Sequence, residues 1–124
     1  MKRGEIWTVT GGADHAGKPR PVVILQDDRF SDTASVTVCP FTTDPTDAPL
    51  FRRPVRPTGG NGLSQPSRIM ADKIMTVPRA TVGLRVGVLE AAHLAWIGKA
   101  VLVFLGLAGG GFSDEEASGQ APAD

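Results

Sequence analysis

The chain has 124 residues, which is enough for one domain but not for two. Apolar residues make up 41% of the composition and charged residues 21%, which excludes a disordered or fibrous protein. The formal net charge is zero, and by itself this argues against a nucleic-acid partner. However, residues 109–124 contain four of the thirteen acidic residues and no Lys or Arg. Residues 1–108 therefore carry a net charge of +4, and the acidic end masks a moderately basic domain.

Cysteine use and hydropathy indicate the compartment. Cys39 is the only cysteine, so the chain can form no internal disulfide and has no cysteine-rich metal site. This composition fits the reducing cytosol. The opening MKRGEIWTV lacks the apolar stretch of a secretory signal, and the apolar run Ala100–Ala108 is far shorter than the about 20 residues that a membrane-spanning helix needs. We therefore expect a cytoplasmic protein without a membrane partner, a metal or a cofactor.

Short β-strands are predicted for the first half of the chain. Glu5–Thr10 (EIWTVT) is rich in β-branched and aromatic residues. Arg20–Gln26 (RPVVILQ) is an almost continuous apolar run, too short for a helix, and indicates a buried strand. Asp27–Thr33 is a polar connection with room for one helical turn. Ser35–Thr43 (SVTVCPFTT) alternates between apolar and polar residues, and Pro40 within it implies a sheet edge or a bulge.

The second half is predicted to contain shorter strands and one helix. We expect a short strand around Phe51–Val55, a turn at Gly59–Gly62, and two short strands or one bent strand over Ser67–Ala71 and Ile74–Val77. Apolar residues then recur at helical spacing, which predicts an amphipathic helix. This stripe comprises Leu89, Ala92, His93, Trp96, Ile97, Ala100 and Val103.

Five to seven short strands followed by one helix indicate a mainly β protein with some α structure: a small antiparallel barrel with helical additions. We expect one domain over residues 1–108. Residues 109–124 are Gly-rich and acidic, and we expect them to form a disordered tail.

The candidate functional residues lie at strand ends and in loops, because the sequence contains no P-loop, HExxH or CxxC motif. His15 is either a solvated loop residue or a catalytic one. Arg20, which opens a buried strand, either pairs with a carboxylate or has a functional role. Thr42 and Thr43 end a strand, where hydroxyl groups commonly close turns.

Two further groups are charged. In an extended segment Arg68, Met70 and Asp72 lie on one face, where Arg68 and Asp72 form either a surface ion pair or a phosphate binder beside a proton acceptor. Arg52, Arg53 and Arg56 form a basic patch in a Pro-rich segment. This patch is either solvated charge or a contact surface for a phosphate backbone.

Four stretches in register resemble the MazF/PemK/Kid family of toxin endoribonucleases. They are RGEIWTV (Arg3–Val9), RPVVILQ (Arg20–Gln26), VTVCPFTT (Val36–Thr43) and GNGLSQPSRIMADKIMTVPR (Gly60–Arg79), and the match runs from about residue 2 to 107. The resemblance implies an SH3-like barrel, a homodimer, and metal-independent cleavage of single-stranded RNA (mRNA) at short sequences. It also implies growth arrest and a cognate antitoxin protein whose C-terminal segment occupies the RNA groove.

The resemblance also implies roles for individual residues. Arg20 and Thr42 fall on the family's catalytic arginine and threonine, and Asp72 falls on an acidic position proposed as the base in one branch. His15 falls near a loop histidine of that branch. Met70 stands where the same branch has an arginine proposed as general acid, so Arg68 or Arg20 would take that role. The residues expected to bind RNA are Lys18, Arg52, Arg53, Ser67, Arg68 and Lys73.

The expected mechanism needs a base for the 2′-hydroxyl proton, donors that stabilise the phosphorane, and a proton for the 5′-oxygen. Asp72 or His15 would be the base, and Arg20 with the Thr42 hydroxyl would stabilise the phosphorane. Products would carry 2′,3′-cyclic phosphate and 5′-hydroxyl ends. Two alternatives remain: a non-catalytic RNA- or protein-binding barrel, and a gyrase poison of the CcdB type, which shares this barrel.

Overall fold

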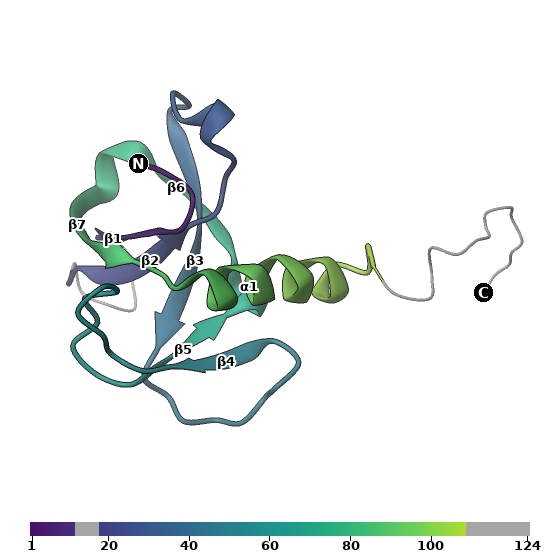
Figure 1. The fold of residues 1–124 in the computed structure, drawn as a ribbon. Coiled ribbons are helices and arrows are strands. Elements are labelled where there is room, and N and C mark those ends of the chain that lie inside the picture. Colours follow the sequence, from purple (N-terminus) through teal and green to yellow (C-terminus); the bar gives the residue numbers. More distant parts are fainter. Residues whose placement is uncertain (12–17, 109–124) are drawn as a thin grey trace, which may run out of the picture.

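The computed structural model describes residues 1–11 and 18–108, and these residues form a mostly antiparallel sheet with one helix (Figure 1). The strands are β1 (Glu5–Val9), β2 (Arg20–Ile24), β3 (Ser35–Thr42), β4 (Arg52–Val55), β5 (Ser67–Met70), β6 (Met75–Pro78) and β7 (Val82–Val88). The helix is α1 (Ala91–Phe104). Single 3-10 turns form η2 (Asp28–Phe30), η3 (Ala71–Lys73) and η4 (Arg79–Thr81).

The strands pair in the order β4-β5-β3-β2-β1-β7, and β6 pairs with β3 outside this path. The predicted fold class, a mainly β protein with a C-terminal helix, is confirmed. The word barrel describes the curvature of the sheet only. In the part of the chain that the structure describes, the end strands β4 and β7 do not pair, so the hydrogen-bonded path stays open.

Strand β2 is buried on both faces, which explains its continuous apolar sequence. Val23 packs in a cluster with Cys39 of β3 and Ile97 of α1. Its neighbours Val22 and Ile24 pack in a second cluster on the other face of the sheet. Successive residues of a strand point to opposite faces, so a strand covered on both sides must be apolar at successive positions.

Strand β3 is central in the sheet, so of the two alternatives for Pro40, a sheet edge or a bulge, the sheet edge is wrong. On one side β3 pairs with β2. On the other it pairs with β6 through Ser35–Val38 and then with β5 through Phe41 and Thr42. Pro40 is in register with Val22 of β2 and, on the other side of β3, lies between the residues paired with β6 and those paired with β5.

Strand β7 was not predicted from the sequence. It has the sequence VGLRVGV and pairs with β1 along most of its length. Gly83 and Gly87 obscure its alternation, since glycine weakens strand propensity. Gly87 is nevertheless required by the fold, because a Cβ atom there would overlap the backbone of Gly60 and Asn61.

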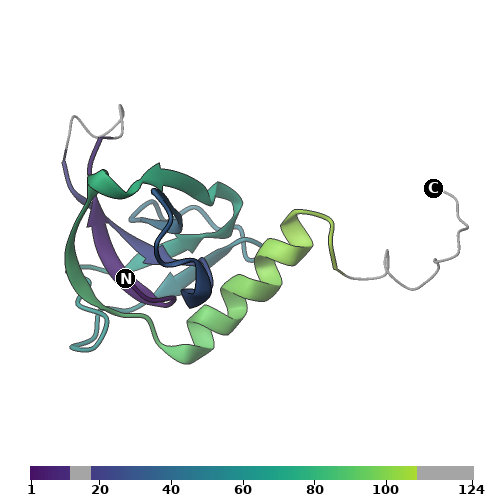
Figure 2. The same cartoon turned by 90° about the horizontal axis from the view of Figure 1, so that it is seen from above.

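Helix α1 lies along one side of the curved sheet, and its C-terminal end extends beyond it (Figure 2). Ile97 and Ala100 are buried as the stripe predicts. Leu89, just before the helix, is buried too, but Ala92 is exposed and Val103 is 55% exposed, so the predicted stripe is wrong at these two positions. The reason is that the sheet covers only the middle of the helix. No helix in the described ranges is long and apolar enough to cross a membrane.

Candidate active site

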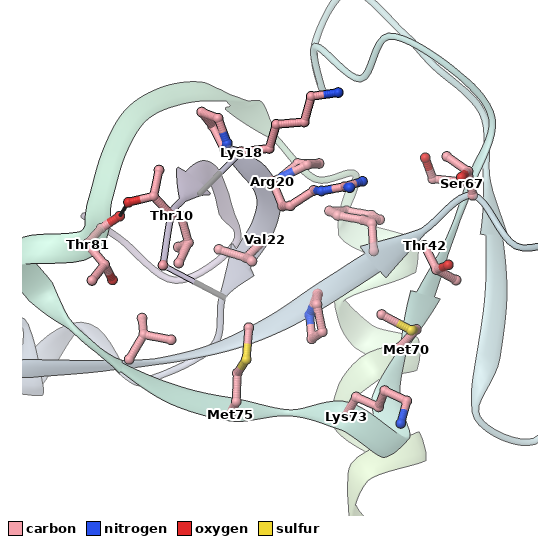
Figure 3. Close-up of a pocket in the computed structure, with 18 of the residues that line it drawn as sticks. Thr10, Lys18, Arg20, Val22, Thr42, Ser67, Met70, Lys73, Met75 and Thr81 are labelled. Carbon is pink, nitrogen blue, oxygen red and sulfur yellow. Dashed lines mark hydrogen bonds between the residues drawn. The ribbon is translucent and has the colours of Figure 1, made fainter. Parts of the chain in front are cut away.

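A cavity of about 920 Å³ opens between the start of β2, the end of β3, and the segment formed by β5 and η3 (Figure 3). Polar side chains on its walls come from residues far apart in the chain: Lys18, Arg20, Thr42, Ser67 and Lys73. Apolar side chains line the rest, among them Val22, Phe41, Met70, Met75 and Val77. The sheet therefore brings together two basic segments and the hydroxyl groups of Thr42 and Ser67, which are separate in the sequence.

Arg20 is the first residue of β2, and its register partner is Val9 of β1. Its backbone belongs to the sheet, but its side chain is exposed and points across the cavity toward the side on which Thr42 and Ser67 lie (Figure 3). Among the described residues it forms no ion pair. The guanidinium is thus held by a rigid strand and is open to an anionic ligand.

Thr42 is the last residue of β3 and faces the same cavity. Its hydroxyl oxygen accepts a hydrogen bond from the backbone N–H of Asp44 at 3.1 Å. A threonine hydroxyl has one hydrogen to donate, and this contact does not use it. The hydroxyl hydrogen is therefore available to a ligand oxygen in the cavity.

The charge of the cavity walls has one sign. Lys18, Arg20 and Lys73 line it, and no Asp or Glu does in the ranges 1–11 and 18–108. A hollow lined by cations concentrates anions, and three basic side chains around an apolar floor suit a phosphodiester carrying planar bases. The arrangement can bind a phosphate and stabilise additional negative charge on it.

Asp72 lies outside this cavity, because β5 ends at Met70 and the chain continues into η3. The expectation that Arg68, Met70 and Asp72 share one extended face is therefore wrong. Both carboxylate oxygens of Asp72 accept hydrogen bonds from Arg52, from Nε at 2.9 Å and from Nη2 at 3.1 Å. These bonds from Arg52 lower the pKa of Asp72. A carboxylate held in this way is a weak proton acceptor.

The basic patch predicted from Arg52, Arg53 and Arg56 does not form one surface in the structure. Arg52 pairs with Asp72, and the Nε of Arg53 donates to His93 Nδ1 of α1 at 2.8 Å. Neither arginine lines the cavity, so the structure does not place them with the other residues expected to bind RNA. Arg56, by contrast, is exposed.

Arg68 borders a second, smaller hollow of about 610 Å³ together with Arg56. Its guanidinium lies 3.8 Å from the exposed carboxylate of Asp47. The two hollows share Thr43 and Ser67 on their rims, so Arg68 lies near the first cavity but not in it.

His15 belongs to residues 12–17, which lie outside the described residues, as does the predicted tail over 109–124. In the described parts of the chain no group of three or more His, Cys, Asp or Glu side chains is arranged to hold a metal ion.

Sequence reasoning missed Ser64 and Gln65, which lie on the cavity wall after the Gly59–Gly62 turn. It also missed the apolar floor formed by residues such as Phe41 and Met75. These residues have no distinctive spacing in the sequence. Only the crossing of β3, β5 and β6 places them around one hollow.

The fold and the cavity define a small β protein with a cationic, anion-binding hollow at the ends of its strands. The family model described as the PemK-like, MazF-like toxin of type II toxin–antitoxin systems matches residues 2–105. The chain therefore belongs to this family of toxins, as the sequence motifs predict.

A relative and several solved structures agree with this assignment. The chain is 53% identical over 109 residues to the probable endoribonuclease MazF of Mycolicibacterium smegmatis, covering 88% of this chain and all of that protein. It is similar to the Mycobacterium tuberculosis toxin MazF-mt6, with a TM-score of 0.67, 29% identity, and coverage of 82% and 97% of the two chains.

A third similar structure is an endoribonuclease in complex with its cognate antitoxin from a mycobacterial species. The TM-score is 0.70 at 23% identity, with coverage of 87% of this chain and 97% of that one. At this identity the likeness concerns the fold alone.

Proposed function

We propose that this protein is a toxin endoribonuclease that cleaves single-stranded RNA, with the scissile phosphate bound between Arg20 and Thr42. The observation that carries the proposal is the cationic cavity, where the Arg20 guanidinium, which has no ion-pair partner within 1–11 and 18–108, lies across from the Thr42 hydroxyl. Family membership and the 53% identity to a probable endoribonuclease support the same activity.

In the proposed reaction the 2′-hydroxyl of one nucleotide attacks the adjacent phosphorus atom. Arg20 and the Thr42 hydroxyl stabilise the negative charge that accumulates on the phosphorane. The charge of Arg20 also stabilises the departing 5′-oxygen, which takes its proton from water, because a guanidinium is too weak an acid to supply one. The products carry 2′,3′-cyclic phosphate and 5′-hydroxyl ends.

Asp72 and His15 are the two candidates for the base. The arrangement around Asp72 argues against Asp72 and favours His15. The Asp72 carboxylate is occupied by Arg52 and lies outside the cavity. We therefore propose His15 as the base. An imidazole has an ordinary pKa of about 6.5, which suits proton transfer near neutral pH.

The partners follow from the same proposal. We propose that the protein works in the cytoplasm on mRNA and is held inactive by a cognate antitoxin protein. One similar solved structure is an endoribonuclease in complex with its cognate antitoxin, and another contains MazE and MazF of Deinococcus radiodurans. We further propose that residues 1–108 are the toxin domain and that the acidic residues 109–124 are dispensable for its folding.

The test is cleavage of a long RNA by the purified protein in EDTA, with the new 5′ ends mapped and their chemistry determined. We expect cleavage with 5′-hydroxyl ends. Arg20→Ala should remain folded and lose about 10²–10³ in rate, the typical effect of removing one transition-state donor. Arg20→Lys retains the charge but not the planar fork, and should recover part of the activity.

Cleavage that EDTA abolishes, or products with 3′-hydroxyl ends, would contradict the mechanism. If RNA is bound but not shortened, the protein is a binding barrel and not an enzyme. An Arg20→Ala variant that cuts within tenfold of the parent rate would remove Arg20 from the site.

A further inference from the structure

Arg52 and Asp72 form a mostly buried ion pair beside the cavity. The pair joins β4 to η3, and its side chains are only 13% and 14% exposed. Two parallel hydrogen bonds, at 2.9 Å and 3.1 Å, fix the plane of the Arg52 guanidinium relative to the plane of the Asp72 carboxylate. Such bidentate pairs have a narrow choice of geometry, so they hold the segments that carry them in one relative position.

The segment that this pair holds lies on the wall of the cavity. Met70 precedes η3 and Lys73 ends it, and both line the cavity, whereas Asp72 between them does not (Figure 3). The backbone also holds this segment, since Met70 pairs with Arg52 in the β4–β5 ladder and the N–H of Ala71 donates to the carbonyl of Phe51, just before β4, at 2.9 Å. Without the ion pair, η3 would lose the side-chain contact that fixes its turn against β4.

From this arrangement we infer that Asp72 and Arg52 are positioning residues, which together hold Lys73 on the cavity wall opposite Arg20 for contact with the RNA backbone. The inference rests on the proposed function for the identity of the ligand. It gives Asp72 a task that uses its carboxylate as a hydrogen-bond acceptor from Arg52, and not as a proton acceptor from the substrate.

A positioning role can be distinguished from a purely structural one, because the effect of the ion pair on RNA binding should depend on the presence of Lys73. If Arg52 acts on RNA binding through Lys73, its removal matters only while Lys73 is present. Residues that act as one unit give non-additive effects, and a double-mutant cycle measures that coupling. A purely structural ion pair would change stability without this coupling to Lys73.

The experiment measures the affinity of the full-length protein for a 2′-O-methyl RNA, which cannot be cleaved, at fixed low salt. Lys73→Ala should weaken binding about tenfold, the effect of one charged hydrogen-bond contact. Arg52→Ala should cause a similar loss, and the double variant should bind no more than twofold worse than the weaker single variant. Arg29→Ala, which removes an exposed arginine outside the cavity, is the control for lost charge and should have no comparable effect.

Arg52→Lys keeps the charge but not the fork, and tests the ion pair without leaving the carboxylate unpaired. Its affinity should fall between parent and Arg52→Ala with the circular dichroism spectrum unchanged. Effects of Arg52→Ala and Lys73→Ala that multiply in the double variant would overturn the inference. So would an Arg52→Lys variant that keeps its fold and binds as the parent does.

Kinetics separate the positioning role from a base. A positioning role raises KM for RNA in Asp72→Asn and Arg52→Ala alike, with kcat lowered less than tenfold. A loss of 100-fold or more in kcat for Asp72→Asn, with kcat retained in Arg52→Ala, would identify Asp72 as the base and overturn the inference.

Binding to the uncleavable RNA does not depend on turnover. A parent protein that binds but fails to cleave would therefore contradict the proposed function, while the double-mutant cycle would still support or overturn the positioning role.

Discussion

Thr42 shows how one strand end prepares a side chain for a ligand. The strand β3 stops at Thr42, and the following chain turns so that the N–H of Asp44 donates to the threonine hydroxyl oxygen. This contact orients the hydroxyl oxygen, and its single hydrogen can be donated to a phosphate oxygen. Because strand ends are held by the ladder, such a donor is positioned before the ligand arrives.

Replacing Thr42 tests this donor. Thr42→Val has nearly the same shape and favours a strand, so the fold should be retained, while cleavage of RNA should fall about 10²–10³-fold. Thr42→Ser keeps the hydroxyl and should keep most of the activity. Initial cleavage rates of the three proteins, with circular dichroism as a check of folding, decide the point. Equal rates for Thr42→Val and the parent would remove the hydroxyl from the mechanism.

Contacts between elements explain how α1 is held against β4. The Nε of Arg53 donates to His93 Nδ1, and the guanidinium lies 5.7 Å from the ring centre of Trp96. The bond requires a neutral imidazole, because protonated Nδ1 is a donor. Burial, and after it the charge of Arg53, lower the pKa of His93, with Glu90 opposing the shift.

This lowered pKa predicts how stability depends on pH. The unfolded chain protonates His93 near its ordinary value of about 6.5, whereas the folded chain does so only at lower pH. The unfolded state therefore binds more protons as pH falls below about 6.5, and the folded state loses stability down to its own lower pKa. Urea unfolding at pH 7.5, 6.5 and 5.5 should show this loss.

The matched variant is His93→Gln. It removes the titrating group, so its stability should change less between pH 7.5 and 5.5 than that of the parent. If both proteins lose stability equally, another group causes the pH dependence.

The turn at Gly59–Gly62 connects β4 to β5 and is held from two sides. Asn61 is fully buried, and its side chain bonds the backbone of Thr58, Leu63 and Arg56. Gly62 has φ +69°, and a Cβ atom there would overlap the carbonyl oxygen of Val86 in β7. Both the conformation and the space require glycine at this position.

Two glycines should therefore respond in opposite directions to alanine. Gly62→Ala should lower the free energy of unfolding by roughly 2 kcal/mol or more, since it combines a left-handed conformation with steric overlap. Gly98→Ala, within α1 and with no heavy atom near the new Cβ, should raise it by roughly 0.5–1 kcal/mol. Urea unfolding midpoints measure both, and a Gly62→Ala protein as stable as the parent would contradict the structure of the turn.

At the scale of the whole molecule, the end of α1 leaves apolar side chains on the surface. Leu102, Val103 and Phe104 are each 45–55% exposed, and Leu105 and Leu107 continue the patch beyond the helix. The ring of Phe104 packs on Phe51 at 5.9 Å between centroids, so the patch is continuous with the segment before β4. Contiguous apolar surface of this kind marks an interaction site, and we propose that a second copy covers it.

Charging this patch should separate the copies. We expect sedimentation equilibrium at micromolar concentration to give a dimer for the parent and a monomer for the double variant Val103→Glu/Leu105→Glu. Its helical circular dichroism should be retained, because both residues are exposed. Phe30→Glu, an exposed apolar residue on η2, is the control and should stay dimeric. A monomeric parent would contradict the proposed assembly.

Local sequence patterns determined much of the fold. Alternation and apolar runs predicted strands at β1 through β6 and the middle of α1, because side-chain direction repeats with the period of the element itself. Family motifs placed Arg20 and Thr42 at strand ends, and the structure brings both to one cavity. Strand β7 escaped prediction because Gly83 and Gly87 interrupt the apolar pattern, and Gly87 is needed to make room for Gly60 and Asn61.

Only the tertiary structure decided which arginine side chains are held by a partner from another element. Arg52 and Arg53 look alike in sequence beside Arg56. The register of β4 and the position of α1 give them partners 20 and 40 residues away, Asp72 and His93. Such pairings depend on which strands and helices become neighbours, and no local pattern encodes that choice. The sequence by itself therefore determined the family and every strand except β7, whereas the sheet decided which arginines face the cavity and which support its wall.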